Sequence, residues 1–107
     1  MGKNSSKNKA LLKELETYLE GYGEVIKEAI FKDIMDTDRR FRADYFIPSI
    51  NCIIEVNGGQ WISGRHNRGG KGYENDLTKL NIAANNGIKV FQFTYEMLSE
   101  LDYKNYL

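Results

Sequence analysis

The chain has 107 residues, of which 41% are hydrophobic and 28% charged, a composition typical of one globular domain with one core. Fifteen basic residues balance fifteen acidic ones, which excludes a strongly basic protein whose whole surface attracts nucleic acid. The single cysteine, Cys52, excludes an internal disulfide, and we expect it to be a buried core thiol. No apolar stretch approaches the roughly 20 residues that cross a bilayer, and no signal peptide is visible. We therefore expect a cytoplasmic protein with no membrane partner.

The apolar pattern predicts the order helix, strand, strand, strand, helix, strand, helix. Residues 1–9 are polar and without periodicity, so we expect a flexible tail before a single domain over residues 10–107. Glycines follow the first two helices and Pro48 stops the second strand. We place the elements at residues 10–20 (helix), 24–34, 41–48 and 52–57 (strands), 73–86 (helix), 88–94 (strand) and 96–107 (short helix or turn).

The third strand, "CIIEVN", is nearly continuous in apolar character, which is typical of a central strand covered on both faces. A short turn around Ser49 makes the second and third strands antiparallel neighbours. The helix between the third and fourth strands implies that those two run parallel. We therefore expect an α+β fold, with a small mixed sheet of about four strands and a helix on each face.

Two carboxylates interrupt these strands. Counted from the turn, Asp44 and Glu55 are placed to lie side by side, which is destabilising unless a positive charge lies between them. Oxygen ligands of this kind suit Mg²⁺ or Mn²⁺. A plainer interpretation pairs Asp44 with the neighbouring Arg42. Glu55 has no such explanation, because a charge in so apolar a strand costs several kcal/mol unless it is compensated.

The segment between the third strand and the second long helix is rich in glycine and basic groups. Its glycines allow backbone N–H groups to approach an anion closely, and Trp61 and Tyr73 flank it with rings that can stack on bases. Alone, this pattern is more typical of a flexible solvated loop, and it indicates a nucleic-acid contact only next to the carboxylate pair. The groups expected to contact a nucleic-acid strand are Gln60, Trp61, Arg65, His66, Arg68 and Lys71.

Lys79 lies in the predicted helix after this loop. A lysine near a metal–phosphate site can orient or help to deprotonate the attacking water and offset developing charge. The alternative is a surface lysine that pairs with Asp76 one helical turn earlier.

Taken together, "RRFRADYFIP", "IIEVNGGQW" and "SGRHNRGGKGYENDLTKLNIAANNGIKVFQFT" resemble the PD-(D/E)XK nuclease superfamily, which has the restriction-endonuclease-like fold. Within it, the chain is similar to small phage and bacterial endonuclease-domain proteins related to very-short-patch repair endonucleases. The resemblance spans residues 28–94, and its motifs are specific in combination although weak singly.

The resemblance implies phosphodiester hydrolysis that depends on Mg²⁺ or Mn²⁺. Asp44 and Glu55 match the metal-binding acids, and Glu28 matches an upstream acid. Superfamily members usually carry a lysine two residues after the second acid, where this chain has Asn57, so Lys79 is the expected substitute. For the upstream acid, the alternatives to Glu28 are Glu14, Glu16 and Glu24. Other positions that match the family motif and are expected to line the site are Gln60, Arg65, His66 and Asp76.

The expected partner is DNA, either duplex or branched, and the expected process is DNA repair, recombination or processing. If a phage encodes the protein, the expected compartment is the host cytoplasm. A homodimer is also expected, because one small domain usually cuts two strands as two copies. Two other readings compete. An HNH nuclease is excluded because that motif needs at least two histidines and the chain has one. A catalytically inactive nuclease fold that only binds nucleic acid stays open because of Asn57.

Overall fold

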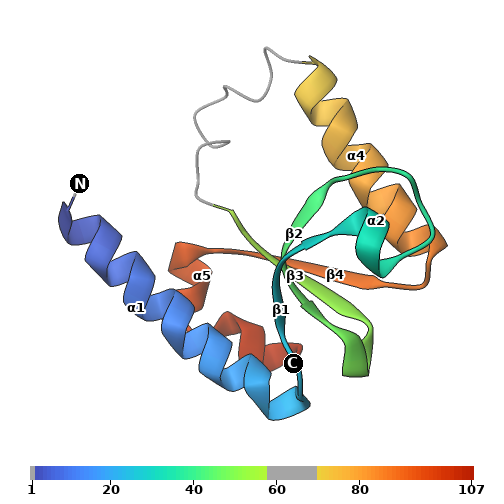
Figure 1. Cartoon of the computed structure of the whole chain (residues 1–107). Helices are drawn as coiled ribbons and strands as arrows, with labels where there is room; N and C mark the ends of the chain where they lie inside the picture. Colours follow the sequence, from blue (N-terminus) through green and yellow to red (C-terminus); the bar gives the residue numbers. More distant parts are fainter. Residues whose placement is uncertain (1, 58–69) are drawn as a thin grey trace.

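The computed structural model describes residues 2–57 and 70–107, and the side chains of residues 6–57 and 72–107. Four strands form one mixed sheet with helices on both faces (Figure 1). The helices are α1 (Gly2–Leu19), α2 (Phe31–Ile34), α4 (Gly70–Asn85) and α5 (Tyr95–Ser99), the strands are β1 (Ile26–Ile30), β2 (Arg42–Ile47), β3 (Cys52–Asn57) and β4 (Lys89–Thr94), and the 3₁₀ turns are η1 (Glu20–Tyr22), η2 (Pro48–Ile50) and η4 (Asp102–Asn105).

The strand order is β1-β2-β3-β4, with antiparallel pairing of β1 with β2 and of β2 with β3, and parallel pairing of β3 with β4. This confirms the expected mixed sheet and both expected pairings of β3. The parallel pairing is possible because the chain crosses over through α4 between the two strands. The turn between β2 and β3 places Asn51 in the left-handed region, at φ 52°.

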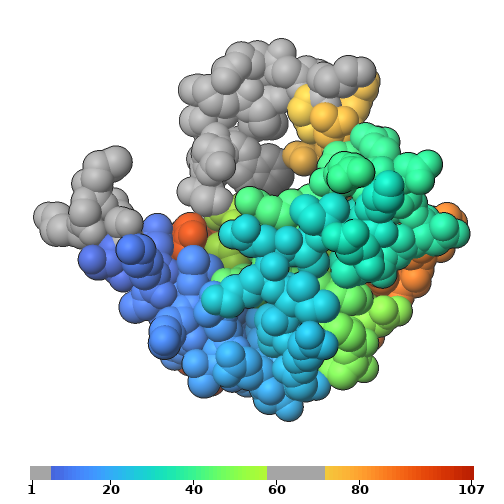
Figure 2. Space-filling view, in the orientation of Figure 1, coloured from blue at the N-terminus to red at the C-terminus, as the bar shows by residue number. Residues whose placement is uncertain are grey.

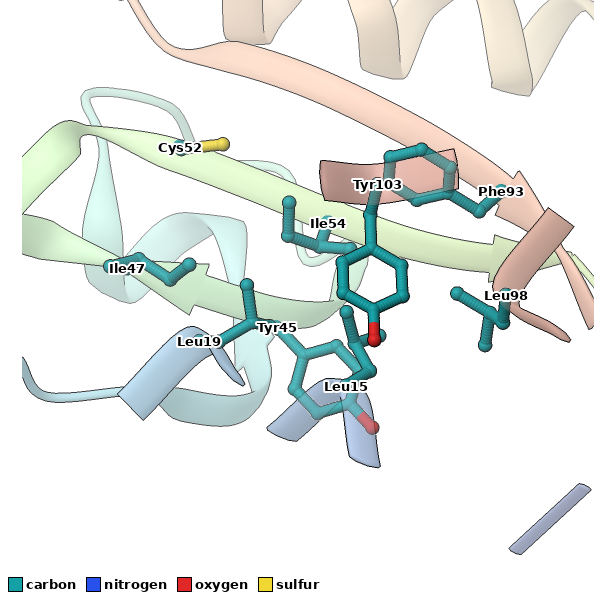
Figure 3. Packing of buried hydrophobic residues seen from close by; sticks show 9 residues of the cluster. All are labelled: Leu15, Leu19, Tyr45, Ile47, Cys52, Ile54, Phe93, Leu98 and Tyr103. Carbon is teal, nitrogen blue, oxygen red and sulfur yellow. The ribbon is translucent and has the colours of Figure 1, made fainter. Parts of the chain in front are cut away.

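The sheet separates two apolar clusters. One lies under α1, α5 and η4, and Figure 3 shows Tyr103 in it with its hydroxyl directed toward α1. The other lies under α2 and α4 and includes Phe31, Ile53 and Ala83. Cys52 is buried in the first cluster, as expected, and burial raises the pKa of its thiol to about 11. Within the described residues, no helix is long and apolar enough to span a membrane.

The largest differences from the predicted boundaries lie at the first helix and at the end of the first strand. The first helix begins at Gly2, so it covers residues 2–9, where we expected a flexible tail. The first strand ends at Ile30, although the prediction continued it to residue 34. The reason is that Phe31 and Ile34, three residues apart, both pack in the α2–α4 cluster, which a helical turn achieves and a strand does not.

Helix α4 ends where its sequence predicts. Gly87 has φ 72°, and the amides of Gly87 and Ile88 donate to the carbonyls of Ala84 and Ala83 at 3.0 and 2.9 Å. This is a Schellman ending, in which a glycine takes the left-handed conformation. It fixes where the chain leaves α4 and enters β4, and therefore the level at which β4 pairs with β3.

The side of α4 that packs on the sheet is not the side with the most prominent apolar stripe. Tyr73, Leu77 and Leu80 are 53%, 43% and 36% exposed, whereas Ala83 is fully buried. Lys79 belongs to the packed side, because only 19% of its side chain is exposed. The rotation of α4 about its own axis therefore brings a lysine, rather than the leucines, against the sheet.

A polar contact attaches α1 to the sheet on the opposite face. The Tyr45 hydroxyl donates to Glu16 Oε2 at 2.7 Å, and Lys27 Nζ lies 3.3 Å from Glu16 Oε1. Burial and the Glu16 carboxylate raise the pKa of Tyr45 far above its ordinary value. The hydroxyl is therefore protonated at neutral pH and is the donor in its bond to Glu16.

We expect Tyr45→Phe to lower the free energy of unfolding by about 1 kcal/mol, because the partly buried Glu16 loses a donor while the ring still fills its place. Urea denaturation measures this, with Tyr106→Phe as the control, since Tyr106 is 59% exposed. The control should change stability by less than about 0.5 kcal/mol. Equal losses in the two variants would contradict a specific role for the Tyr45–Glu16 bond.

Candidate active site

The two predicted carboxylates come from neighbouring strands. The β2–β3 pairing runs from Ile47–Cys52 to Tyr45–Ile54. Continued by one residue, this register places Asp44 opposite Glu55, and the Asp44 charge does act on Glu55. Directly opposite residues of an antiparallel pair point to the same face, with Cβ atoms about 5 Å apart. Here that face is the one covered by α4, because Ile53, two residues before Glu55 on the same strand, belongs to the same apolar cluster as Ala83 of α4. The strands therefore bring both acids under α4.

Asp44 is held on both of its oxygens. The backbone amide of Val56 donates to Asp44 Oδ2 at 2.8 Å, and Arg42 NH2 lies 3.3 Å from Asp44 Oδ1. The side chain is 29% exposed. The Arg42 pair, which the sequence offered as the plainer explanation, is thus present. The bond from the Val56 amide has a further effect that the Arg42 pair does not have, because it fixes the Asp44 carboxylate of β2 against the backbone of β3.

Glu55 is paired with Lys79. Lys79 Nζ lies 2.5 Å from Glu55 Oε2 and donates to the backbone carbonyl of Arg42 at 2.8 Å. Only 13% of the Glu55 side chain and 19% of the Lys79 side chain are exposed. The ammonium also lies 5.8 Å from the centre of the Phe31 ring, within the range of a cation–π contact. Lys79 is therefore not a surface lysine paired with Asp76.

The surroundings of Glu55 shift its pKa in opposite directions. Burial raises the pKa of Glu55 above its ordinary value of 4.5, and the charges of Asp44 and Asp76 raise it further. The hydrogen bond and the charge of Lys79 lower it, without cancelling the rise. A carboxylate in this state gains stability from any additional positive charge that approaches it. Perturbation by burial together with a specific charged partner is characteristic of functional sites.

Glu28 lies at the same level of the sheet on β1. It falls between the pairs Lys27–Tyr45 and Ala29–Ala43, which places it across from Asp44. Its φ is 53°, a left-handed conformation that is uncommon for a residue other than glycine. The side chain is exposed. Of the alternatives, Glu16 bonds Tyr45 on the opposite face, and Glu14 and Glu24 are exposed outside the strands.

Two more polar residues lie beside Glu55 on β3 and β4. One is Asn57, and the other is Gln92, which the sequence analysis did not predict. Asn57 Nδ2 donates to Gln92 Oε1 at 3.3 Å, and Gln92 pairs directly with Glu55 in the parallel ladder. The signal for Gln92 was present, because it is the one polar residue inside "VFQF" and the parallel pairing was predicted. Arg42 and Phe31, which contact Lys79 through a carbonyl and a ring, were also missed as parts of the site.

Of the remaining predicted site residues, only Asp76 has a described side chain. Asp76 is exposed on α4, one turn before Lys79, and acts on Glu55 through its charge. Lys71 belongs to the first turn of α4. The predicted contact residues that lie outside the described part of the chain are Gln60, Trp61, Arg65, His66 and Arg68.

The described residues contain no group of three or more histidine, cysteine, aspartate or glutamate side chains placed to hold a metal ion. The donor set for a cation is the pair Asp44 and Glu55. Hard oxygen donors in this number suit Mg²⁺, which commonly takes one or two carboxylates and completes its coordination with water and phosphate oxygens. The burial of Glu55 and the nearby charge of Asp44 both raise its pKa and would favour such an ion, which would share the Glu55 carboxylate with the Lys79 ammonium.

Comparison with known proteins gave no match for this chain among family models, curated proteins or solved structures. The functional inference therefore depends on the geometry of the site and on the motifs in the sequence.

We expect Lys79→Met to lower the free energy of unfolding at pH 7 by about 2 kcal/mol, because it leaves a largely hidden Glu55 carboxylate without its counter-charge. The pKa of Glu55 in the folded protein, already raised, would rise further. The folded state then binds a proton more readily than the unfolded state, so stability is regained as the pH falls. Urea denaturation between pH 7 and pH 4.5 should show the deficit relative to the unsubstituted protein shrinking.

The control for this series is Lys89→Met, which removes an exposed lysine at the other end of the β3–β4 ladder. A deficit in Lys79→Met that is the same at every pH would contradict the pairing with Glu55.

Proposed function

We propose that the protein is a metal-dependent DNA endonuclease with a restriction-endonuclease-like core. The observation that carries the proposal is the convergence of Asp44, Glu55 and Lys79 from three different elements, β2, β3 and α4, on one face of the sheet. The acid pair and the lysine are the groups that the sequence motifs assign to the chemistry. The strand order, with an antiparallel pair before a helical crossover to a parallel strand, is compatible with that core.

Each residue has a distinct task in the proposed reaction. The carboxylate oxygens of Asp44 and Glu55 would hold Mg²⁺ or Mn²⁺, which when bound supplies positive charge at the scissile phosphate and makes a coordinated water more acidic. The Val56 amide orients Asp44 so that the carboxylate does not rotate away. Lys79 Nζ, fixed by the Arg42 carbonyl as well as by Glu55, stabilises the negative charge that develops on the phosphate oxygens.

Lys79 supplies the positive charge that is missing at position 57, where the chain has Asn57 instead of the usual lysine. The side chain of Asn57 is neutral and donates to Gln92, so it supplies no positive charge to the acid pair. The ammonium comes instead from α4, 22 residues after Asn57, and contacts the Glu55 carboxylate directly. The contact between Lys79 and Glu55 therefore supports the proposal that the lysine has moved to α4.

The alternative function is a nuclease-fold module that binds nucleic acid without cleaving it. The observation that favours it is the double anchoring of Lys79 on Glu55 and on the Arg42 carbonyl, which can be a purely structural arrangement. Binding and cleavage are separable by experiment, and the next two experiments distinguish them.

We expect the protein to cleave plasmid, single-stranded or branched DNA in Mg²⁺ or Mn²⁺ and to be inactive in EDTA. Glu55→Gln and Asp44→Asn should each lower the cleavage rate at least about a hundredfold, because each removes a charged metal ligand. Glu100→Gln, an exposed acid on the opposite face, is the matched control and should cleave normally. Binding without cleavage of any substrate would contradict the enzyme proposal, and cleavage by Glu55→Gln would contradict the site.

We expect Lys79→Met to lower cleavage by a similar factor while Mg²⁺ binding, measured by calorimetry, is retained or strengthened. The reason is that the ammonium no longer competes with the ion for Glu55, although the charge that stabilises the transition state is gone. Asp44→Asn should lose binding and cleavage together. Cleavage at the normal rate in a folded Lys79→Met protein would show that Lys79 is only structural.

A further inference from the structure

Three arginines follow one another closely on the segment that leads from α2 into β2. Arg39, Arg40 and Arg42 are all exposed, and no acidic residue lies between them. Arg42 pairs with Asp44, and its carbonyl accepts from Lys79, so this segment borders the candidate active site. In Figure 2 the teal-to-green atoms of residues 35–42 lie on the molecular surface, next to the yellow and orange atoms of α4.

The backbone that carries these arginines is fixed at several points. The Phe31 amide donates to the Phe41 carbonyl at 2.8 Å, and the Arg39 amide donates to Thr37 Oγ1 at 3.1 Å. Earlier in the segment, the Asp36 amide donates to Oδ1 of Asn86, the residue directly after α4, at 3.0 Å. The arginines therefore extend from a backbone of defined shape, which lowers the entropy lost when they contact a ligand.

Arg39 is additionally held by an aromatic ring. Its guanidinium lies 4.5 Å from the centre of the Phe41 ring, and the Phe41 ring meets the Phe31 ring edge to face at 5.8 Å. Lys79 lies over Phe31. A guanidinium stacked on a ring keeps the N–H groups at its edge free to bond phosphate oxygens. A continuous series of rings and cations thus joins Arg39 to the ammonium beside Glu55.

Acidic residues are present nearby but do not neutralise the first two arginines. Asp36 and Asp38 precede them on the same segment and are exposed. Across the described residues, the ion pairs are Lys27–Glu16, Arg42–Asp44 and Lys79–Glu55, and none involves Arg39 or Arg40. Both guanidiniums are therefore available to an external anion, in a protein whose net charge is zero.

We propose that Arg39, Arg40 and Arg42 form a phosphate-binding surface that holds the DNA backbone beside the Asp44–Glu55 pair. The proposal rests on the proposed nuclease function for its choice of DNA as the polyanion. It adds to that function three arginines that the sequence prediction had not assigned to DNA binding. Planar guanidiniums suit this task because they bond two phosphate oxygens at once. Arg42, paired with Asp44, is the member of the group that adjoins the scissile position.

The test is binding in EDTA, where no cleavage occurs, of a fluorescent DNA duplex at several salt concentrations. Arg39→Ala/Arg40→Ala should bind about tenfold more weakly near 0.1 M salt. The slope of log K against log salt, which is negative, should become less steep by about 1.8, because two phosphate contacts are lost at about 0.9 each. The matched control is Lys89→Ala/Lys104→Ala, which removes two exposed lysines of other elements and should keep the parental slope.

A second variant keeps the test decisive if the alanine protein is poorly folded. Arg39→Lys/Arg40→Lys retains both charges, so it should keep the salt slope within about 0.5 of the parent while losing the bidentate bonds and some affinity. Three results would each overturn the inference and leave these arginines as solvated surface groups. They are a parental slope in a folded Arg39→Ala/Arg40→Ala protein, an equal change of slope in the Lys89→Ala/Lys104→Ala control, and no DNA binding by the parent.

The same experiment separates this inference from the nuclease proposal. If the parent binds duplex with the predicted arginine dependence but never cleaves in Mg²⁺, the nuclease proposal fails and the phosphate-binding surface stands. If the parent cleaves and the alanine variant binds with the parental slope, the surface fails and the nuclease proposal stands.

Discussion

The ion pair between Glu55 and Lys79 is the interaction on which the arrangement of this protein depends. A carboxylate in the central strand and an ammonium on the packed side of a helix are each costly to hide, and each is tolerated because the other is present. The pair explains why α4 packs with Lys79 inward while Tyr73, Leu77 and Leu80 face outward. The third contact of the ammonium, with the Arg42 carbonyl, extends the same interaction to β2 and to the arginine segment before it.

Around this pair, the sheet supplies positions and the helix supplies charge. The antiparallel register of β2 and β3, continued one residue past Tyr45–Ile54, places Asp44 opposite Glu55. The Val56 amide holds Asp44 in place, and the parallel ladder sets Gln92 beside Glu55. The pKa of Glu55 remains above its ordinary value even with Lys79 in contact, so the site has capacity for further positive charge. The physical basis for proposing a divalent cation and a phosphate substrate is the approach of carboxylate oxygens from two strands beside a largely buried lysine, and the raised pKa of Glu55 agrees with it.

Much of this arrangement follows from the sequence, because it depends on local signals. The apolar run "CIIEVN", the turn after Pro48 and the glycine at position 87 fix β3, its antiparallel partner and the end of α4, and so predict that Asp44 meets Glu55. The end of β1 could not be predicted, because "FKDI" fits both a strand and a helical turn until Phe31 has a core to enter. The orientation of α4 was equally inaccessible, since its leucines suggest the wrong side and only the tertiary contact with Glu55 selects Lys79.

The most direct test of the account is the location of a bound divalent ion in solution. Substoichiometric Mn²⁺ added to ¹⁵N-labelled protein broadens the amide signals nearest the ion, and the account predicts that those of residues 44–45 and 55–56 fade first. Asp44→Asn should abolish this pattern while the rest of the spectrum is unchanged. Broadening centred on the exposed acids of residues 33–38, or broadening of residues 55–56 that persists in Asp44→Asn, would contradict a metal site between β2 and β3.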